Sequence, residues 1–134
     1  MSGKDSRAIP SFYNPDAVLN TFSAVWGGDY ARRVHDVYFQ VDPFNANFGV
    51  NKDEYICYAM RLLRSVREHF KRRHASPLTE KLLAELVSRS FHPEQVVLGL
   101  VSAEQLSLIT GLLLPIFSEK GVLDKIKSKT AAVK

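Results

Sequence analysis

The stretch that decides the fold lies in the middle of the chain and reads NKDEYICYAMRLLRSVREHFKRRH, residues 51–74. Asn51 followed by Glu54 resembles a capping box, in which side chains satisfy backbone amides at the start of a helix. Apolar side chains then recur at helical spacing on one face, whereas charged side chains occupy another. The apolar face consists of Tyr55, Ala59, Leu62, Leu63, Val66 and Phe70. We therefore expect a helix over residues 51–74 that buries this face in a core.

The segments before this helix follow the same pattern. Asn14-Pro15-Asp16 is typical of a helix start, and the apolar spacing continues to Trp26. Gly27-Gly28 is expected to break the chain before a second helix, Tyr30–Val41. The β-branched and aromatic residues of Val37–Val41 leave a strand possible there. Asp42–Asn51 has the composition of a loop.

The segments after residue 74 also read as helices. Ser76-Pro77 predicts a cap and a first-turn proline for a helix that ends near Ser90. Three more helical segments are expected: Pro93–Val101, Ala103–Ser118 with a capping box at Ser102, and Val122–Ser128. Short turns and no convincing alternating strands indicate an all-α fold, a compact bundle of about five to six helices. Residues 1–11 are expected to form a flexible arm, 12–128 a single helical domain, and 129–134 a flexible Lys-rich tail.

Composition narrows the class of protein. The 134 residues suit one domain, and the hydrophobic fraction of 46% is too high for a disordered chain. A single cysteine cannot form an internal disulfide, and no stretch approaches the roughly 20 apolar residues of a membrane span. The polar first ten residues lack the apolar core of a signal peptide. We expect a single domain in the reducing cytoplasm, with no membrane span.

The positive charge is concentrated in two segments. The formal net charge is +4, but residues 61–74 carry six basic residues against Glu68, and residues 120–134 carry five lysines against Asp124. The remainder of the chain is therefore mildly acidic. Segregated charge of this kind says more about partners than the mean does. The candidate anion-binding or partner-binding residues are Arg61, Arg64, Arg67, Lys71, Arg72 and Arg73.

Two interpretations of this basic segment stay open. One is a binding surface for phosphates of DNA or RNA, or for an acidic protein surface. The other is a solvated helix end, because cations in the last turn complement the helix dipole. Phe70 is the one aromatic residue within the basic run, and its spacing places it in the core. This disfavours a protein that binds single-stranded nucleic acid, because base stacking needs exposed aromatic side chains. The match to a helix-turn-helix motif is also weak. Its second helix would be Pro93–Val101, in which only Gln95 could form hydrogen bonds with a base.

The motifs of catalysis and metal binding were searched for and not found. Cys57 has no second cysteine beside it, and we expect a small buried side chain there. The four histidines lack metal-ligand spacing, and Gly27-Gly28 belongs to no phosphate-binding loop. No pair of carboxylates suggests general acid–base catalysis. The sequence predicts no catalytic residue, no metal and no cofactor, and favours a protein that is not an enzyme.

The apolar side chains of Leu98-Gly99-Leu100-Val101 and Leu106–Phe117 exceed what a small bundle easily covers, which leaves an interface with a partner or a second copy possible. The segment Ala103–Ser118 is apolar on most sides, which is typical of a helix buried in the centre or in an interface. We expect Leu106–Leu113 to be central and Pro115 to kink the helix. On either side of Pro115, Leu114, Ile116 and Phe117 are candidates for an apolar interface with another protein or a second copy.

Two functions remain for such a chain. The first is a small helical interaction module, a subunit, adaptor or chaperone-like partner of a larger assembly. The alternative is a nucleic-acid-binding accessory protein that uses residues 61–74 and the Lys-rich tail. They differ in whether these two basic segments converge on one surface or lie apart.

Overall fold

The computed structural model describes residues 15–44, 55–72 and 77–128, and in these ranges the chain forms seven helices and no strand. The all-α prediction is confirmed, and Val37–Val41 is helical. The expected arm and tail, residues 1–11 and 129–134, lie outside the described residues. The helices are α1 (Pro15–Trp26), α2 (Asp29–Val41), α3 (Ile56–Arg72), α4 (Glu80–Arg89), α5 (Pro93–Val97), α6 (Ala103–Ser118) and α7 (Val122–Lys127).

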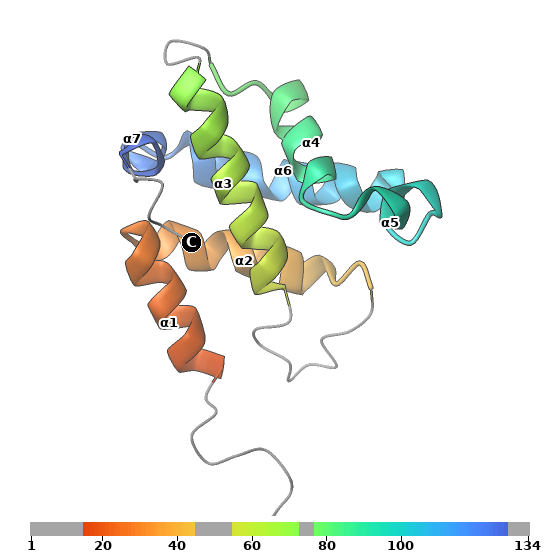
Figure 1. Ribbon diagram of the computed structural model, residues 1–134, viewed down its shortest axis with the longest axis horizontal. Helices are drawn as coiled ribbons and strands as arrows, with labels where there is room; N and C mark the ends of the chain where they lie inside the picture. Colours follow the sequence, from red (N-terminus) through yellow and green to blue (C-terminus); the bar gives the residue numbers. More distant parts are fainter. Residues whose placement is uncertain (1–14, 45–54, 73–76, 129–134) are drawn as a thin grey trace, which may run out of the picture.

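The helices are arranged around the pair α2 and α6, which pack against each other (Figure 1). Helix α3 packs on α2, and α4 packs on α6 and on α3. Helix α1 covers α2 at one side of the molecule, and α7 contacts α3 and α6. None of the helices in the described ranges has the length and apolar character needed to cross a membrane.

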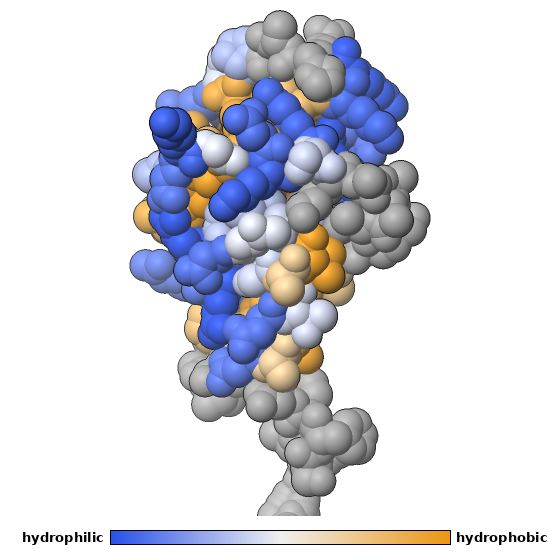
Figure 2. All heavy atoms as spheres, turned by 90° about the vertical axis from the view of Figure 1, so that its left-hand side faces the viewer, coloured by the Kyte–Doolittle hydropathy of each residue, from blue (hydrophilic) through white to orange (hydrophobic). Residues whose placement is uncertain are grey.

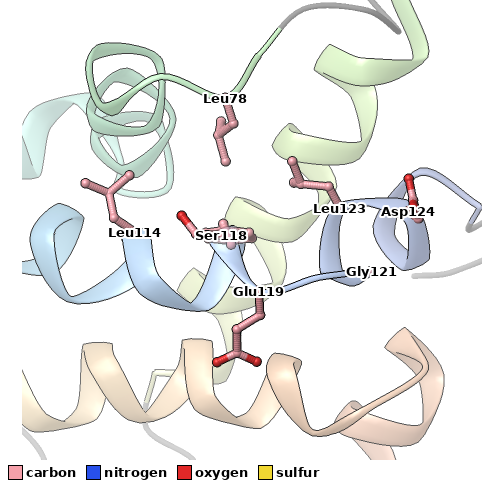
Figure 3. A pocket seen from close by; sticks show the side chains of 8 residues that line it. Leu78, Leu114, Ser118, Glu119, Gly121, Leu123 and Asp124 are labelled. Carbon is pink, nitrogen blue, oxygen red and sulfur yellow. The ribbon is translucent and has the colours of Figure 1, made fainter.

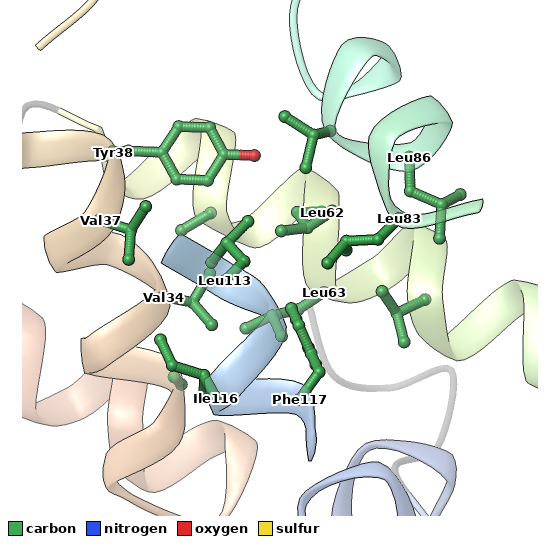
Figure 4. Close-up of a cluster of buried hydrophobic side chains, with 14 of the residues drawn as sticks. Val34, Val37, Tyr38, Leu62, Leu63, Leu83, Leu86, Leu113, Ile116 and Phe117 are labelled. Carbon is green, nitrogen blue, oxygen red and sulfur yellow. The ribbon is translucent and has the colours of Figure 1, made fainter. Parts of the chain in front are cut away.

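The apolar face expected for the central helix is confirmed. Its six side chains, from Tyr55 to Phe70, are each at most 1% exposed. Figure 4 shows Leu62 and Leu63 meeting side chains from three other helices. Helical spacing therefore located the side of this helix that faces the core correctly. The partners in this view are Val34, Val37 and Tyr38 of α2, Leu83 and Leu86 of α4, and Leu113, Ile116 and Phe117 of α6.

Helix α4 begins later than the sequence predicted. Its N-cap is Thr79, whose hydroxyl accepts a hydrogen bond from the Leu82 amide at 3.1 Å. The prediction that Ser76 and Pro77 start this helix is therefore wrong. Thr79 is itself a good cap, and its extended backbone lets the side chain reach back over the first turn.

Helix α5 ends earlier than the sequence predicted, at Val97 instead of Val101. The Gly99 amide donates to Val96 and the Leu100 amide to Gln95, which is the Schellman pattern. Gly99 takes the left-handed conformation that this pattern requires, with φ at +76°. The chain therefore turns outward and reaches α6 through a capping box between Ser102 and Gln105, as predicted.

The turn between α6 and α7 depends on the backbone of Gly121, whose φ is +85°. We expect Gly121→Ala to lower the free energy of unfolding by about 1–2 kcal/mol, because L residues pay that much in the left-handed region. A Cβ at this position would meet no atom within 4 Å, so the effect is purely conformational. Gly111→Ala is the matched control, since Gly111 lies inside α6 with equal space and should stabilise by up to about 1 kcal/mol. Urea unfolding of both variants measures the two effects, and equal values would contradict this account.

Candidate functional site

The six basic residues expected to form one surface have different environments. Arg61 donates to the Ser90 carbonyl at 3.2 Å, lies 3.2 Å from the Nε2 atom of His92, and sits 5.5 Å from the centre of the Tyr58 ring. These contacts join α3 to the connection between α4 and α5. Arg61 is therefore engaged in holding the fold.

Arg67 is buried, which corrects the expectation of an available cation at this position. Its guanidinium pairs with Glu68 at 3.0 Å and lies 6.0 Å from the centre of the Trp26 ring. An arginine can cover apolar surface with its stem and an aromatic face with its planar head, so helical spacing alone does not decide its exposure.

The remaining basic side chains of α3 divide between a hollow and open solvent. Arg64 and Arg72 line a hollow of about 350 Å³ between α3 and α4. Lys71 is exposed and outside this hollow, and Arg73 lies outside the described residues. We call this hollow the basic hollow; its lining is Arg64, Ser65, Glu68, His69, Arg72, Leu86 and Arg89.

Of the seven residues that line the basic hollow, only Arg64 and Arg72 were predicted as site residues, and His69 and Arg89 are the two further basic side chains. His69 lies one turn beyond Ser65 on α3, and its position on this side could have been read from the spacing of Arg64, Glu68 and Arg72. Arg89 comes from the last turn of α4. Arg89 lies in the basic hollow only because α4 packs on α3, so no local sequence pattern could predict this position.

The lysines of α7 lie apart from the basic hollow. Helix α7 packs on α3 on the side away from α4 (Figure 1). The Nζ atom of Lys127 lies 4.9 Å from the centre of the Phe70 ring, which faces the core. Among the described residues, the two basic segments therefore do not merge into one continuous surface.

The apolar interface expected after Pro115 needs correction. Ile116 and Phe117 are 5% and 3% exposed and belong to the core, because α6 turns this face toward α2 and α3. Leu114 is half-buried. It lines a hollow of about 390 Å³ with Leu78 of the segment before α4 and residues of α7 (Figure 3).

Exposed apolar side chains instead gather around the end of α5. Val97 is 82% exposed and Leu98 is 71% exposed, followed by Leu100 and Leu108 at 54% and 53%. These are four of the six large exposed hydrophobic residues in the described part of the chain. We call Val97, Leu98 and Leu100 the α5 surface; Leu108 lies further along the chain, in α6. Leu98 and Leu100 belong to the apolar surplus for which the sequence left an interface open, but neither was among the three candidate interface residues.

The other two exposed hydrophobic residues, Val18 and Val25, belong to α1. They line a shallower apolar hollow with Phe22, Ile56 and Met60 between α1 and α3. Figure 2 shows that the face carrying α1 and α7 is largely hydrophilic, with apolar side chains scattered among the hydrophilic ones. Val18 and Val25 are less exposed than the α5 surface.

The titratable groups form no recognisable reactive centre in the described ranges. Cys57 is exposed, so the expectation of a buried side chain is wrong; it lies on the outer side of α3. His35 is buried next to Asp36, with 3.2 Å between Nδ1 and Oδ1. No three His, Cys, Asp or Glu residues of the described chain are placed to hold a metal ion together.

Comparison of the chain with known protein families, with characterised proteins and with solved structures finds no match. Two features of the described chain are candidates for a functional site, the α5 surface and the basic hollow.

Proposed function

We propose that this protein is a small, non-enzymatic helical interaction module that binds a protein partner through the α5 surface. The observation that carries the proposal is the exposure of three large apolar side chains within four consecutive residues, Val97, Leu98 and Leu100. Monomeric proteins rarely expose contiguous apolar patches beyond a few hundred Å², and such patches commonly mark interaction sites.

The backbone beneath the α5 surface is held in place by its own hydrogen bonds. The amide of His92 donates to the Gln95 side chain at 2.8 Å, and the Ser102 amide donates to the Gln105 side chain at 3.0 Å. Val101, between these two caps, is 2% exposed and anchors the turn in the core. The apolar side chains are therefore displayed by an ordered turn, so a partner would not have to order it on binding.

Charge around the α5 surface indicates what kind of partner fits. The chain carries no lysine or arginine from Ser90 to Glu119, whereas Glu94 and Glu104 flank the α5 surface and are exposed. An apolar surface with acidic neighbours suits a protein surface with an apolar centre and basic rim. The same acidic neighbours disfavour docking on an anionic membrane, which attracts cations.

The test of this proposal is a pair of matched double variants. Leu98→Ser with Leu100→Ser removes two side chains of the α5 surface, and Val18→Ser with Val25→Ser removes two exposed side chains of α1. We expect only the first pair to abolish binding, with stability changed by about 0.5 kcal/mol or less, since exposed sites tolerate substitution. Light scattering detects a second copy as partner, and quantitative capture on the immobilised chain detects other proteins. Identical oligomeric state and captured proteins for wild type and the α5 variant would reject the proposal.

The alternative function, nucleic-acid binding through residues 61–74 and the Lys-rich tail, has weaker support. Arg61 and Arg67 are engaged within the fold, and α7 lies on the other side of α3 from the basic hollow. A duplex or long single strand needs cations along a continuous track. Of the other described cations of this run, Arg64 and Arg72 line one hollow and Lys71 is exposed outside it.

A further inference from the structure

The basic hollow contains more positive charge than its one carboxylate offsets. Arg64, Arg72 and Arg89 line it from two helices, and Glu68 is the single acidic side chain. The Oε2 atom of Glu68 accepts a hydrogen bond from buried Arg67 at 3.0 Å, so this carboxylate is already occupied. No ion pair joins the three lining arginines to a carboxylate within the described residues.

Donors in the basic hollow are also left without good acceptors. One Nη atom of Arg64 lies 3.2 Å from the sulfur of Met60, and a thioether is only a weak acceptor. The Nε atom of Arg64 and the Nε2 atom of His69 are shielded from solvent and have no hydrogen-bond partner among the described residues. Leaving such groups unsatisfied costs free energy.

We propose that the basic hollow binds the phosphate group of a small phosphorylated molecule. A phosphate monoester carries a charge near −2 and three acceptor oxygens, which match the several guanidinium groups that line this one hollow. The volume of about 350 Å³ holds a phosphate group and a small organic body, and Leu86 offers an apolar wall for that body. No aromatic side chain lines the hollow to stack a base, so a polynucleotide fits less well.

Titration followed by two-dimensional NMR tests the site directly. The probes are inorganic phosphate, glycerol 3-phosphate and a single-stranded oligonucleotide, each added to the full chain in phosphate-free buffer of low ionic strength. We expect saturable shifts for residues of α3 and α4 with the first two probes, including the side-chain Nε–H signals of Arg64 and Arg89. Glycerol 3-phosphate should bind more tightly than inorganic phosphate if the organic body contributes.

Three variants separate the site from general charge effects. Arg64→Gln with Arg89→Gln should weaken phosphate binding by roughly tenfold or more, because charge-assisted hydrogen bonds are lost. Arg89→Gln alone changes an exposed side chain of α4 and keeps the test valid if the double variant unfolds. Arg33→Gln removes the same charge from α2, where Arg33 pairs with Glu119 at 2.8 Å, and should alter affinity less than about twofold.

Three results would overturn the proposal. The first is no saturable shift with either small phosphate at millimolar concentration. The second is equal weakening by Arg33→Gln, which would show an effect of net charge alone. The third is an oligonucleotide that binds more tightly than glycerol 3-phosphate with a steep dependence on salt, which would identify a phosphate track in place of a single site. None of these results affects the α5 surface, so the two proposals succeed or fail separately.

Discussion

Phe117→Ala is expected to lower the free energy of unfolding by about 3–5 kcal/mol, a large part of the 5–15 kcal/mol typical of a domain. Phe117 is 3% exposed and lies in the same buried cluster as Leu63 and Ile116 (Figure 4). Truncation removes the burial of an aromatic ring and leaves a cavity that the surrounding helices fill only in part. Urea unfolding followed by far-UV circular dichroism measures the change.

Leu108→Ser is the control for this prediction, because it changes the opposite side of the same helix. Leu108 is 53% exposed, so its loss should alter the free energy of unfolding by about 0.5 kcal/mol or less. The two variants together report how α6 is rotated about its axis. A strongly destabilised Leu108→Ser with a nearly neutral Phe117→Ala would mean that α6 presents the other face to the core.

This contrast explains why the sequence could predict α3 and could not orient α6. The apolar face of α3 stands out because charged residues such as Arg64, Glu68 and Arg72 occupy its other side. In α6 nearly every position from Leu106 to Phe117 is apolar, so the spacing favours no face. The neighbours α2 and α4 make the choice, and tertiary packing is absent from a local pattern.

The two candidate surfaces differ in the same way. Arg64 and Arg72 were predicted as binding residues, since both lie in the basic run of α3. Arg89 lines the basic hollow only because α4 packs against α3. Arg67 is not available for binding, because its guanidinium lies against the Trp26 ring. The α5 surface depended on where one helix stops. The glycine signal for that stop was present at Gly99, but the apolar run around it resembled a continuing helix.

Alkaline conditions should destabilise the protein through two buried tyrosines. Burial raises the pKa of Tyr38 and of Tyr30 above the ordinary value of 10.0. Tyr38 is fully buried, and its hydroxyl lies 2.8 Å from the Ser90 hydroxyl, which donates to the Val87 carbonyl. The Tyr30 hydroxyl donates to the Trp26 carbonyl. Both phenols therefore hold their protons in the folded chain.

The direction of the pH dependence follows from this difference between states. Below about pH 10 both states keep these two protons, so the tyrosines add no slope there. Above pH 10 the unfolded chain releases protons that the folded chain retains, so the free energy of unfolding falls as pH rises. Each tyrosine contributes a slope of about 1.4 kcal/mol per pH unit, or about 2.7 for the pair. Urea unfolding at a series of alkaline pH values measures this slope.

Replacing each tyrosine by phenylalanine isolates its contribution. Tyr30→Phe and Tyr38→Phe should each reduce the alkaline slope by one proton, and the double variant should remove both. Tyr38→Phe should also cost about 1 kcal/mol at neutral pH, because the Ser90 hydroxyl loses the donor beside it. This loss of about 1 kcal/mol applies at every pH and is separate from the change in alkaline slope. Unchanged slopes in both variants would mean that these phenols titrate alike in the folded and unfolded chains, and the interior around α2 would then be open to water.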